Sequence, residues 1–272
     1  MLSAWLSHRH HLTSSKNSMP GYTAPRKMSH LMREPALSVK AIIFDLDGTL
    51  YRMRWFMKPL ITIRLFPHCL RLPRFIAVRD TLAGQDFGTG DALLAELGSR
   101  LARRMRARNP MAMRAWILDR FYAEFQAAMP LMGGAREGLS DTLAAARSKG
   151  IRTAVLSDYN RVEERLAGLG INRFQFDLIG SAESLGALKP CPRPFLQMAS
   201  AWELEPGSVL VIGDRDDTDG ASARAAGMRF IQVSNKKRPA GKSRTWAWIK
   251  TYINDLPEVT AETGPGASPA RP

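Results

Sequence analysis

The sequence predicts an α/β protein, in which a doubly wound, Rossmann-like parallel sheet carries an inserted α-helical cap. Three observations predict this fold. The run from Val39 to Phe44 is almost continuously apolar and stops at Asp45, which is typical of a strand buried on both faces of a parallel sheet. After residue 131, short apolar runs alternate with helical periodicity, which favours right-handed strand–helix–strand crossovers. Between these parts, residues 51–130 carry helical periodicity alone.

The composition is that of a globular protein that can bury a full core. The 272 residues are 45% hydrophobic, which argues against wholesale disorder. Cys69 and Cys191 lie far apart and lack metal-binding spacing, so we expect a reduced, cytosolic chain, while a single disulfide stays open. Residues 1–36 contain one acid and no apolar stretch of secretory-signal length. We expect a disordered extension there, with a targeting peptide as the alternative.

The first core segment, residues 37–50, leads into the helical insertion at 51–130. Gly48 lets the backbone turn tightly just after the strand. Within the insertion, residues 91–108 place Leu93, Leu97 and Leu101 at four-residue steps, which predicts an amphipathic helix. Asn109 and the proline after it are a good N-cap and first-turn pair for the next helix.

The segment 52–79 has an unusual composition. It carries seven Lys or Arg and no acid, mixed with aromatic and aliphatic residues. Pro59, Pro67 and Pro73 interrupt it, so it is too charged and too broken to span a bilayer.

The second core segment, residues 131–257, restores the strand and helix alternation after a hinge at Gly133 and Gly134. We expect strands at 152–156, 176–179, 209–212 and 229–233. We expect helices at 135–149, 161–169, 194–204, 220–226 and 245–256. The Pro-, Gly- and Ala-rich tail at 258–272 is expected to be disordered.

Polar side chains follow the predicted strands where each one ends. Asp45 and Asp47 follow the first strand, Ser157 the second, and Asp214 the fourth, while Lys189 lies in the loop before the fourth. Because ligands of such sheets bind beyond the carboxyl ends of the strands, we expect these groups to converge. Clustered carboxylates without histidine favour a hard cation on oxygen ligands, and Mg²⁺ is the expected one.

These residue types together fit phosphoryl transfer. A carboxylate such as Asp45 attacks without a base, and the metal and Lys189 would offset its repulsion by a phosphate dianion. Asp47 is placed to protonate the leaving oxygen and then to deprotonate the hydrolytic water. The Ser157 hydroxyl and loop N–H groups would hold the phosphoryl oxygens.

Four segments, DLDGTL at 45–50, VLSD at 155–158, KP at 189–190 and GDRDDTD at 213–219, resemble the ordered motifs of the haloacid dehalogenase-like (HAD) hydrolase superfamily. The resemblance implies an aspartyl-phosphate on Asp45 and a general acid and base at Asp47. It also implies Mg²⁺ held by Asp45, the Asp47 carbonyl and Asp214, with Ser157 and Lys189 on the phosphoryl group. Either Asp219 or Asp217 would support the metal ligands, and the sequence leaves that choice open.

The net charge of +14 is concentrated outside the core, with +8 in residues 51–130 alone. We considered a solvated cap surface, attraction of a polyanionic substrate and docking of 52–79 on an anionic membrane. Nucleic-acid binding is disfavoured because no recognised motif accompanies the charge.

We therefore expect a cytoplasmic, Mg²⁺-dependent phosphomonoester hydrolase of a small phosphorylated metabolite. The alternative is a HAD-like protein associated with a membrane or a polyanion through 52–79, peripheral to the membrane. It would be either a lipid-phosphate phosphatase or a non-catalytic scaffold.

Overall fold

The computed structural model describes residues 38–236, 239 and 241–259. The extension predicted for 1–36 and most of the predicted tail lie outside the described residues. Glu258 and Val259, the first residues of that tail, are described, and the Val259 N–H donates to the Lys149 carbonyl at 2.8 Å.

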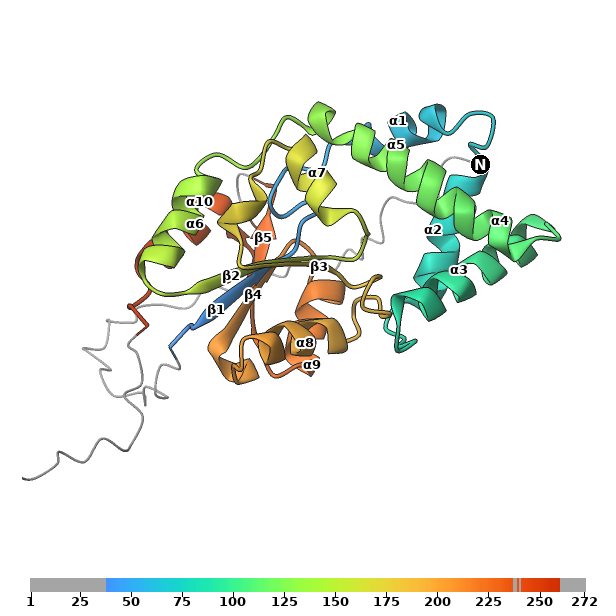
Figure 1. Cartoon of the computed structure of the whole chain (residues 1–272). Coiled ribbons are helices and arrows are strands. Elements are labelled where there is room, and N and C mark those ends of the chain that lie inside the picture. Colours follow the sequence, from blue (N-terminus) through green and yellow to red (C-terminus); the bar gives the residue numbers. More distant parts are fainter. Residues whose placement is uncertain (1–37, 237–238, 240, 260–272) are drawn as a thin grey trace, which may run out of the picture. The chain divides into compact units, whose positions relative to one another are not determined.

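The described residues form a six-stranded parallel sheet in the order β3-β2-β1-β4-β5-β6 (Figure 1). This confirms the predicted doubly wound α/β fold. The strands are β1 (Ala41–Phe44), β2 (Arg152–Ser157), β3 (Leu178–Ser181), β4 (Val209–Gly213), β5 (Arg229–Ser234) and β6 (Arg244–Thr245).

Helices cover both faces of the sheet because β1 is apolar on both sides. Ile42 and Phe44 pack in one core cluster, and Ala41 and Ile43 pack in another. The first cluster includes residues of α6, α7 and α10, and the second includes residues of α8 and α9, on the opposite side of the sheet (Figure 1). These helices are α6 (Leu139–Ser148), α7 (Val162–Gly168), α8 (Arg193–Ala201), α9 (Ala221–Ala225) and α10 (Trp246–Asn254).

Two sheet elements differ from the sequence prediction. β3 begins at Leu178, two residues later than predicted, because its parallel pairing with β2 starts where Leu178 meets Ala154. Phe176 is buried but lies before the strand. The two-residue strand β6 was not predicted, because it is too short to show a period-two pattern.

The inserted residues 51–130 are helical. Their helices are α1 (Met57–Arg64), α2 (Arg71–Leu82), α3 (Gly90–Met105), α4 (Pro110–Ala115), the π-helical turn η1 (Trp116–Phe121) and α5 (Tyr122–Ala127). Leu93, Leu97 and Leu101 are buried along one side of α3, as their spacing predicted. The Asn109 side chain accepts a hydrogen bond from the Ala112 N–H at 3.2 Å, which confirms the predicted N-cap of α4.

The proline-containing segment 52–79 forms helices α1 and α2. Pro59 and Pro73 each stand third in their helix, where the missing N–H has no partner within the helix to lose. Phe75 of α2 is buried, with its ring centroid 6.2 Å from that of Trp116 and 4.7 Å from that of Phe121. Pro59 and Pro73 therefore mark helix starts, whereas Pro67 lies in the turn between α1 and α2.

Two of the contacts between the inserted helices and the core lie beside the strand ends. Arg79 of α2 forms a buried ion pair with Glu183, which also accepts a hydrogen bond from the Tyr122 hydroxyl at 2.6 Å. The loop after α2 pairs with the loop after β3, where the Gly84 N–H donates to the Leu188 carbonyl at 3.1 Å. Both attachments adjoin residues that the sequence placed in the functional site.

Candidate functional site

Lys189 joins the ends of three strands. Its ammonium donates to Asp45 Oδ1 at 2.8 Å, to Asp219 Oδ1 at 2.7 Å and to the Leu156 carbonyl at 2.9 Å. Asp45 directly follows β1, Leu156 lies in β2, and Asp219 follows β4 in the π-helical turn η5 (Asp216–Gly220). The lysine is 2% exposed, so these contacts are made away from bulk water.

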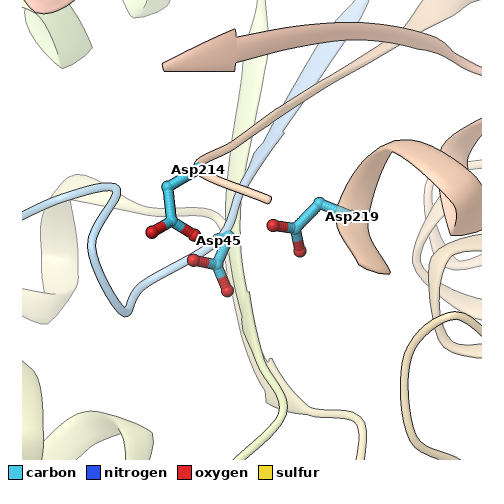
Figure 2. Close-up of side chains that lie close together, drawn as sticks. All are labelled: Asp45, Asp214 and Asp219. Carbon is cyan, nitrogen blue, oxygen red and sulfur yellow. The ribbon is translucent and has the colours of Figure 1, made fainter. Parts of the chain in front are cut away.

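Three carboxylates converge at this point. Side-chain oxygens of Asp45, Asp214 and Asp219 lie within 4.8 Å of one another, with their carboxyl groups pointing toward a common centre (Figure 2). Gly48 allows this approach: its φ is +81°, and a Cβ there would stand 2.2 Å from Asp214 Oδ2. Only glycine fits this combination of backbone conformation and close contact.

The negative charge of this cluster exceeds what Lys189 balances. Burial, with the charges of Asp219 and Asp47, raises the pKa of Asp214 to about 7. Burial also raises the pKa of Asp45, although Lys189 lowers it, and the other carboxylates raise it further. Oxygen ligands carrying excess negative charge are the donor set that a hard divalent cation prefers. The acidic cluster therefore fits a divalent cation.

Asp47 occupies a different environment, with hydrogen-bond donors on both carboxylate oxygens. Oδ1 accepts from the Tyr51 hydroxyl at 2.7 Å and from Arg165, and Oδ2 accepts from the Ser157 hydroxyl at 3.0 Å. Burial alone would raise the pKa of Asp47, but the charge of Arg165 and these hydrogen bonds outweigh burial and lower the pKa. Asp47 is therefore held ionised.

Sequence reasoning missed Arg165. It is fully buried on α7, and its Nη1 donates to Ser157 Oγ at 3.0 Å while its guanidinium lies 4.2 Å from the Phe125 ring centroid. A signal was present, because Arg165 stands three residues after Val162 and one before Leu166, both buried. A charged residue on the apolar face of a helix requires a buried partner, and here that partner is Asp47.

Some of the remaining predicted site residues lie in the buried site, and one lies on the protein surface. Asp217 is exposed and forms an ion pair with Arg215 at 2.5 Å, so of the two alternatives only Asp219 lies in the cluster. Ser157 is buried, and its hydroxyl already binds Asp47. Both cysteines are free, which leaves no disulfide between them.

Arg79 brings the inserted helices to the edge of this site. Its Nη2 donates to the Asp158 carbonyl at 2.9 Å, and its guanidinium lies 4.2 Å from the Tyr159 ring centroid. The Asp158 carboxylate in turn accepts from the Lys189 N–H at 3.0 Å. The residues after Ser157 thus connect the insertion to the loop that carries Lys189.

Comparison with known proteins places this geometry among hydrolases. The family model described as haloacid dehalogenase-like hydrolase matches residues 39–227. Haloacid dehalogenase-like hydrolase domain-containing protein 3 of Homo sapiens is 34% identical over 118 residues, which cover 43% of this chain and 46% of that protein. The phosphoserine phosphatase of Thermus thermophilus is 34% identical over 121 residues, or 43% of this chain and 46% of that enzyme. The chain thus spans about half the length of these relatives.

A longer match and two solved structures extend the comparison. The phosphoglycolate phosphatase of Thiobacillus denitrificans is 27% identical over 217 residues, covering 76% of this chain and 90% of that enzyme. CbbY of Rhodobacter sphaeroides, in complex with xylulose-1,5-bisphosphate, has a TM-score of 0.54 at 22% identity and covers 77% of this chain and 94% of its own. The β-phosphoglucomutase of Clostridium difficile has a TM-score of 0.53 at 17% identity. The match covers 79% of this chain and 97% of that protein. At these identities the structures share the fold alone.

The contrast between Asp219 and Asp217 gives a test of the acidic cluster. We expect Asp219→Asn to weaken Mg²⁺ binding at least about tenfold, because it removes one of three converging carboxylates. The exposed Asp217→Asn makes the same chemical change and should alter the affinity less than about twofold. Isothermal titration calorimetry with Mg²⁺ measures both, and equal affinities for the two variants would contradict the assignment of the cluster.

Arg165→Met tests the buried ion pair. We expect it to lower the free energy of unfolding by about 3–5 kcal/mol, because it leaves the Asp47 charge without its buried partner. Arg173, on the surface beside Glu163 at 3.1 Å, supplies the matched control, and Arg173→Met should cost under about 1 kcal/mol. Urea denaturation measures both. Adding Asp47→Asn to Arg165→Met should recover part of the loss, and a simple addition of the two losses would argue against the pair.

Proposed function

Because this chain belongs to the haloacid dehalogenase-like hydrolase family, we propose that it is a Mg²⁺-dependent phosphatase. It hydrolyses a phosphomonoester of a small metabolite through a phosphorylated Asp45. Two of the similar proteins are named for phosphoserine and phosphoglycolate, which are small phosphorylated acids, and this supports the proposed substrate class.

The contact between Lys189 and Asp45 carries the proposal. A nucleophilic carboxylate must be ionised and aimed at the phosphorus, and the ammonium 2.8 Å from Oδ1 favours the ionised form and fixes its position. The Thr49 hydroxyl donates to the other oxygen, Oδ2, at 3.0 Å. Mg²⁺, held by Asp45, Asp214 and the Asp47 carbonyl with Asp219 beside them, would neutralise charge on the phosphoryl oxygens.

In the first step, a carboxylate oxygen of Asp45 forms a bond to phosphorus while the bond from phosphorus to the ester oxygen breaks. Asp47, which rests ionised, first takes a proton from solvent when substrate binds, and it then gives that proton to the leaving oxygen, so the alcohol departs neutral. In the second step, water attacks the phosphorus and gives a proton to Asp47. The bond to Asp45 then breaks, which releases inorganic phosphate and restores the Asp45 carboxylate, and Asp47 returns its proton to solvent.

The contacts of Asp47 suggest how substrate prepares this proton transfer. In the structure Asp47 Oδ2 accepts the Ser157 hydroxyl. When a phosphoryl oxygen takes that hydroxyl as its own donor, Oδ2 becomes available to carry the proton. Arg165 and Tyr51 meanwhile keep Oδ1 in place. Ser157 thus serves both states, binding Asp47 at rest and phosphate during turnover.

We also propose that the inserted helices of 51–130 act as a cap that excludes water from the reaction. The buried pair of Arg79 and Glu183 holds these helices against the core beside the catalytic strand ends. Opening the cap for substrate separates this pair, which then becomes solvated.

Asp45→Asn tests the proposed nucleophile. We expect phosphate release from p-nitrophenyl phosphate with Mg²⁺ to fall at least about a thousandfold, because an amide oxygen lacks the charge needed for attack. Asp217→Asn, the same change on the exposed carboxylate, should keep its rate. A rate in Asp45→Asn near that of the unchanged protein would remove Asp45 from the mechanism.

A second candidate function, attachment to an anionic membrane, is favoured by the surface of the segment 52–79. Five large apolar side chains are exposed between residues 53 and 70, and Trp55 is 87% exposed. They are Met53, Trp55, Ile63, Phe66 and Leu70. Apolar side chains interleaved with cations are typical of proteins that lie in the membrane interface.

Not all seven cations of 52–79 are available to bind an anionic surface. Arg79 is buried in its pair with Glu183, and Arg64 pairs with Glu124 at 2.7 Å, so two of the seven cations of 52–79 already have acidic partners. Among the described residues, no helix combines the length and apolarity needed to cross a bilayer. We therefore propose contact with the membrane surface as the form this function would take.

Co-sedimentation with vesicles containing an anionic phospholipid tests this candidate. We expect the double variant Trp55→Ser, Phe66→Ser to lose most of its binding, because these side chains supply the apolar contact. Met111→Ser, Phe174→Ser removes two apolar side chains that are exposed elsewhere and should bind like the unchanged protein. Absence of binding by the unchanged protein, or equal loss in both variants, would refute the candidate.

A further inference from the structure

A cavity of about 590 Å³ lies beside the catalytic loop and is lined by residues that the proposed mechanism does not use. Its walls come from the two connections to the inserted helices, from the end of β5 and from the beginning of α10. Its lining includes none of the residues Asp45, Asp47, Ser157, Lys189 or Asp214. The cavity is thus a separate compartment from the catalytic centre.

The cavity is strongly basic. Five of the residues that line it are cationic: Arg52, Arg54, Arg136, Lys236 and Lys250. Among its described lining residues Glu137 is the one acid, and it is exposed. Within the described part of the chain, none of the five cations forms a salt bridge. Positive charge gathers here without the counter-charge that the rest of the protein supplies.

Arg136 forms the inner wall of the cavity. It is 6% exposed, and its Nη2 donates to the Gly48 carbonyl and to Asn235 Oδ1, each at 2.7 Å. These acceptors satisfy hydrogen bonds but carry no full negative charge. Burial, together with the charge of Arg52, lowers the pKa of Arg136 to about 10, with Asp214 acting in the opposite direction. A buried guanidinium is thus crowded by a like charge.

Lys250, on α10, adds a further cation to the lining of the cavity. Its ammonium lies against Gly138, where an added Cβ would stand 2.3 Å from Nζ. Gly138 is the N-cap of the ten-residue helix α6, whose free N–H groups already carry partial positive charge. The first turn of α6 also carries one acid, Asp141, and within the described residues Asp141 forms no salt bridge with Lys250.

We infer that this cavity binds a small oxyanion with two or more negative charges, such as a phosphate or polycarboxylate group, between Arg136, Arg52 and Lys250. Arginine forks match the oxygens of such anions, and lysine supplies a mobile point charge. Binding of an anion in this cavity would be a property separate from the proposed phosphatase activity, and it does not depend on that activity. Because Arg136 binds the carbonyls of Gly48 and Thr49, a bound anion lies one residue contact away from the loop that carries Asp45 and Asp47.

Calorimetric titration of the full chain with inorganic pyrophosphate, in metal-free buffer at low ionic strength, tests the inference. Without metal, the cluster of Asp45, Asp214 and Asp219 repels anions, so the catalytic centre contributes no binding. We expect a single site in the unchanged protein. The double variant Arg52→Gln, Lys250→Gln should weaken it at least about tenfold, because it removes two charge-assisted contacts. Lys236→Gln, at an exposed position, should weaken it by a smaller factor.

The matched control is Arg104→Gln, Arg108→Gln, which removes two exposed charges from the end of α3 and the residues after it. It should bind pyrophosphate within about twofold of the unchanged protein. Thermal unfolding followed by circular dichroism verifies that each variant is folded. Absence of binding by the unchanged protein, or an equal loss in both double variants, would overturn the inference. Since the titration involves neither metal nor turnover, its result is independent of the Asp45→Asn test.

Discussion

The buried ammonium of Lys189 is the interaction on which the candidate site depends. Charges removed from water require partners, and removing one member of a buried pair typically costs several kcal/mol. Lys189 meets this requirement for Asp45 and Asp219 at once and also binds the Leu156 carbonyl. It therefore holds the ends of β1, β2 and β4 in one arrangement. With three carboxylates against one ammonium, the same cluster keeps an excess of negative charge that suits a cation.

Two further buried side chains, Arg165 and Arg136, hold the loop after β1 from different elements. Arg165 of α7 binds the carboxylate of Asp47, whereas Arg136, just before α6, binds the carbonyls of Gly48 and Thr49. One arginine thereby controls the charge of the proposed acid and base, and the other controls the backbone beside it. A loop of a few residues is thus held by contacts from more than eighty residues away along the chain, as the proposed catalytic role of this loop would require.

The inserted helices carry a buried ion pair on the side of the core and exposed apolar side chains on the outside. Toward the core, Arg79 pairs with Glu183 and reaches the carbonyl of Asp158, next to Ser157. On the outside, Trp55, Phe66 and neighbouring apolar residues remain in solvent. An element that contacts the edge of the candidate site and also presents an apolar, basic surface can couple the two. If that surface meets a membrane, attachment would act on the same helices that contact the edge of the candidate site.

The sequence by itself determined the fold class and the grouping of acids at the centre of the candidate site. Apolar runs and helical periods are local patterns, so β1, β2, β4, α3 and the N-cap at Asn109 could be predicted. Acids placed at the ends of adjacent parallel strands meet at one edge of the sheet, so Asp45 and Asp214 could be grouped from the sequence alone. Tertiary structure alone decided between Asp219 and Asp217, paired Arg165 with Asp47 and gathered the cations around Arg136. These outcomes depend on which side chains, distant in the sequence, lie together in the buried interior. The free energy of burying a charged side chain is set by the groups around it in the fold and not by the residues next to it in the sequence.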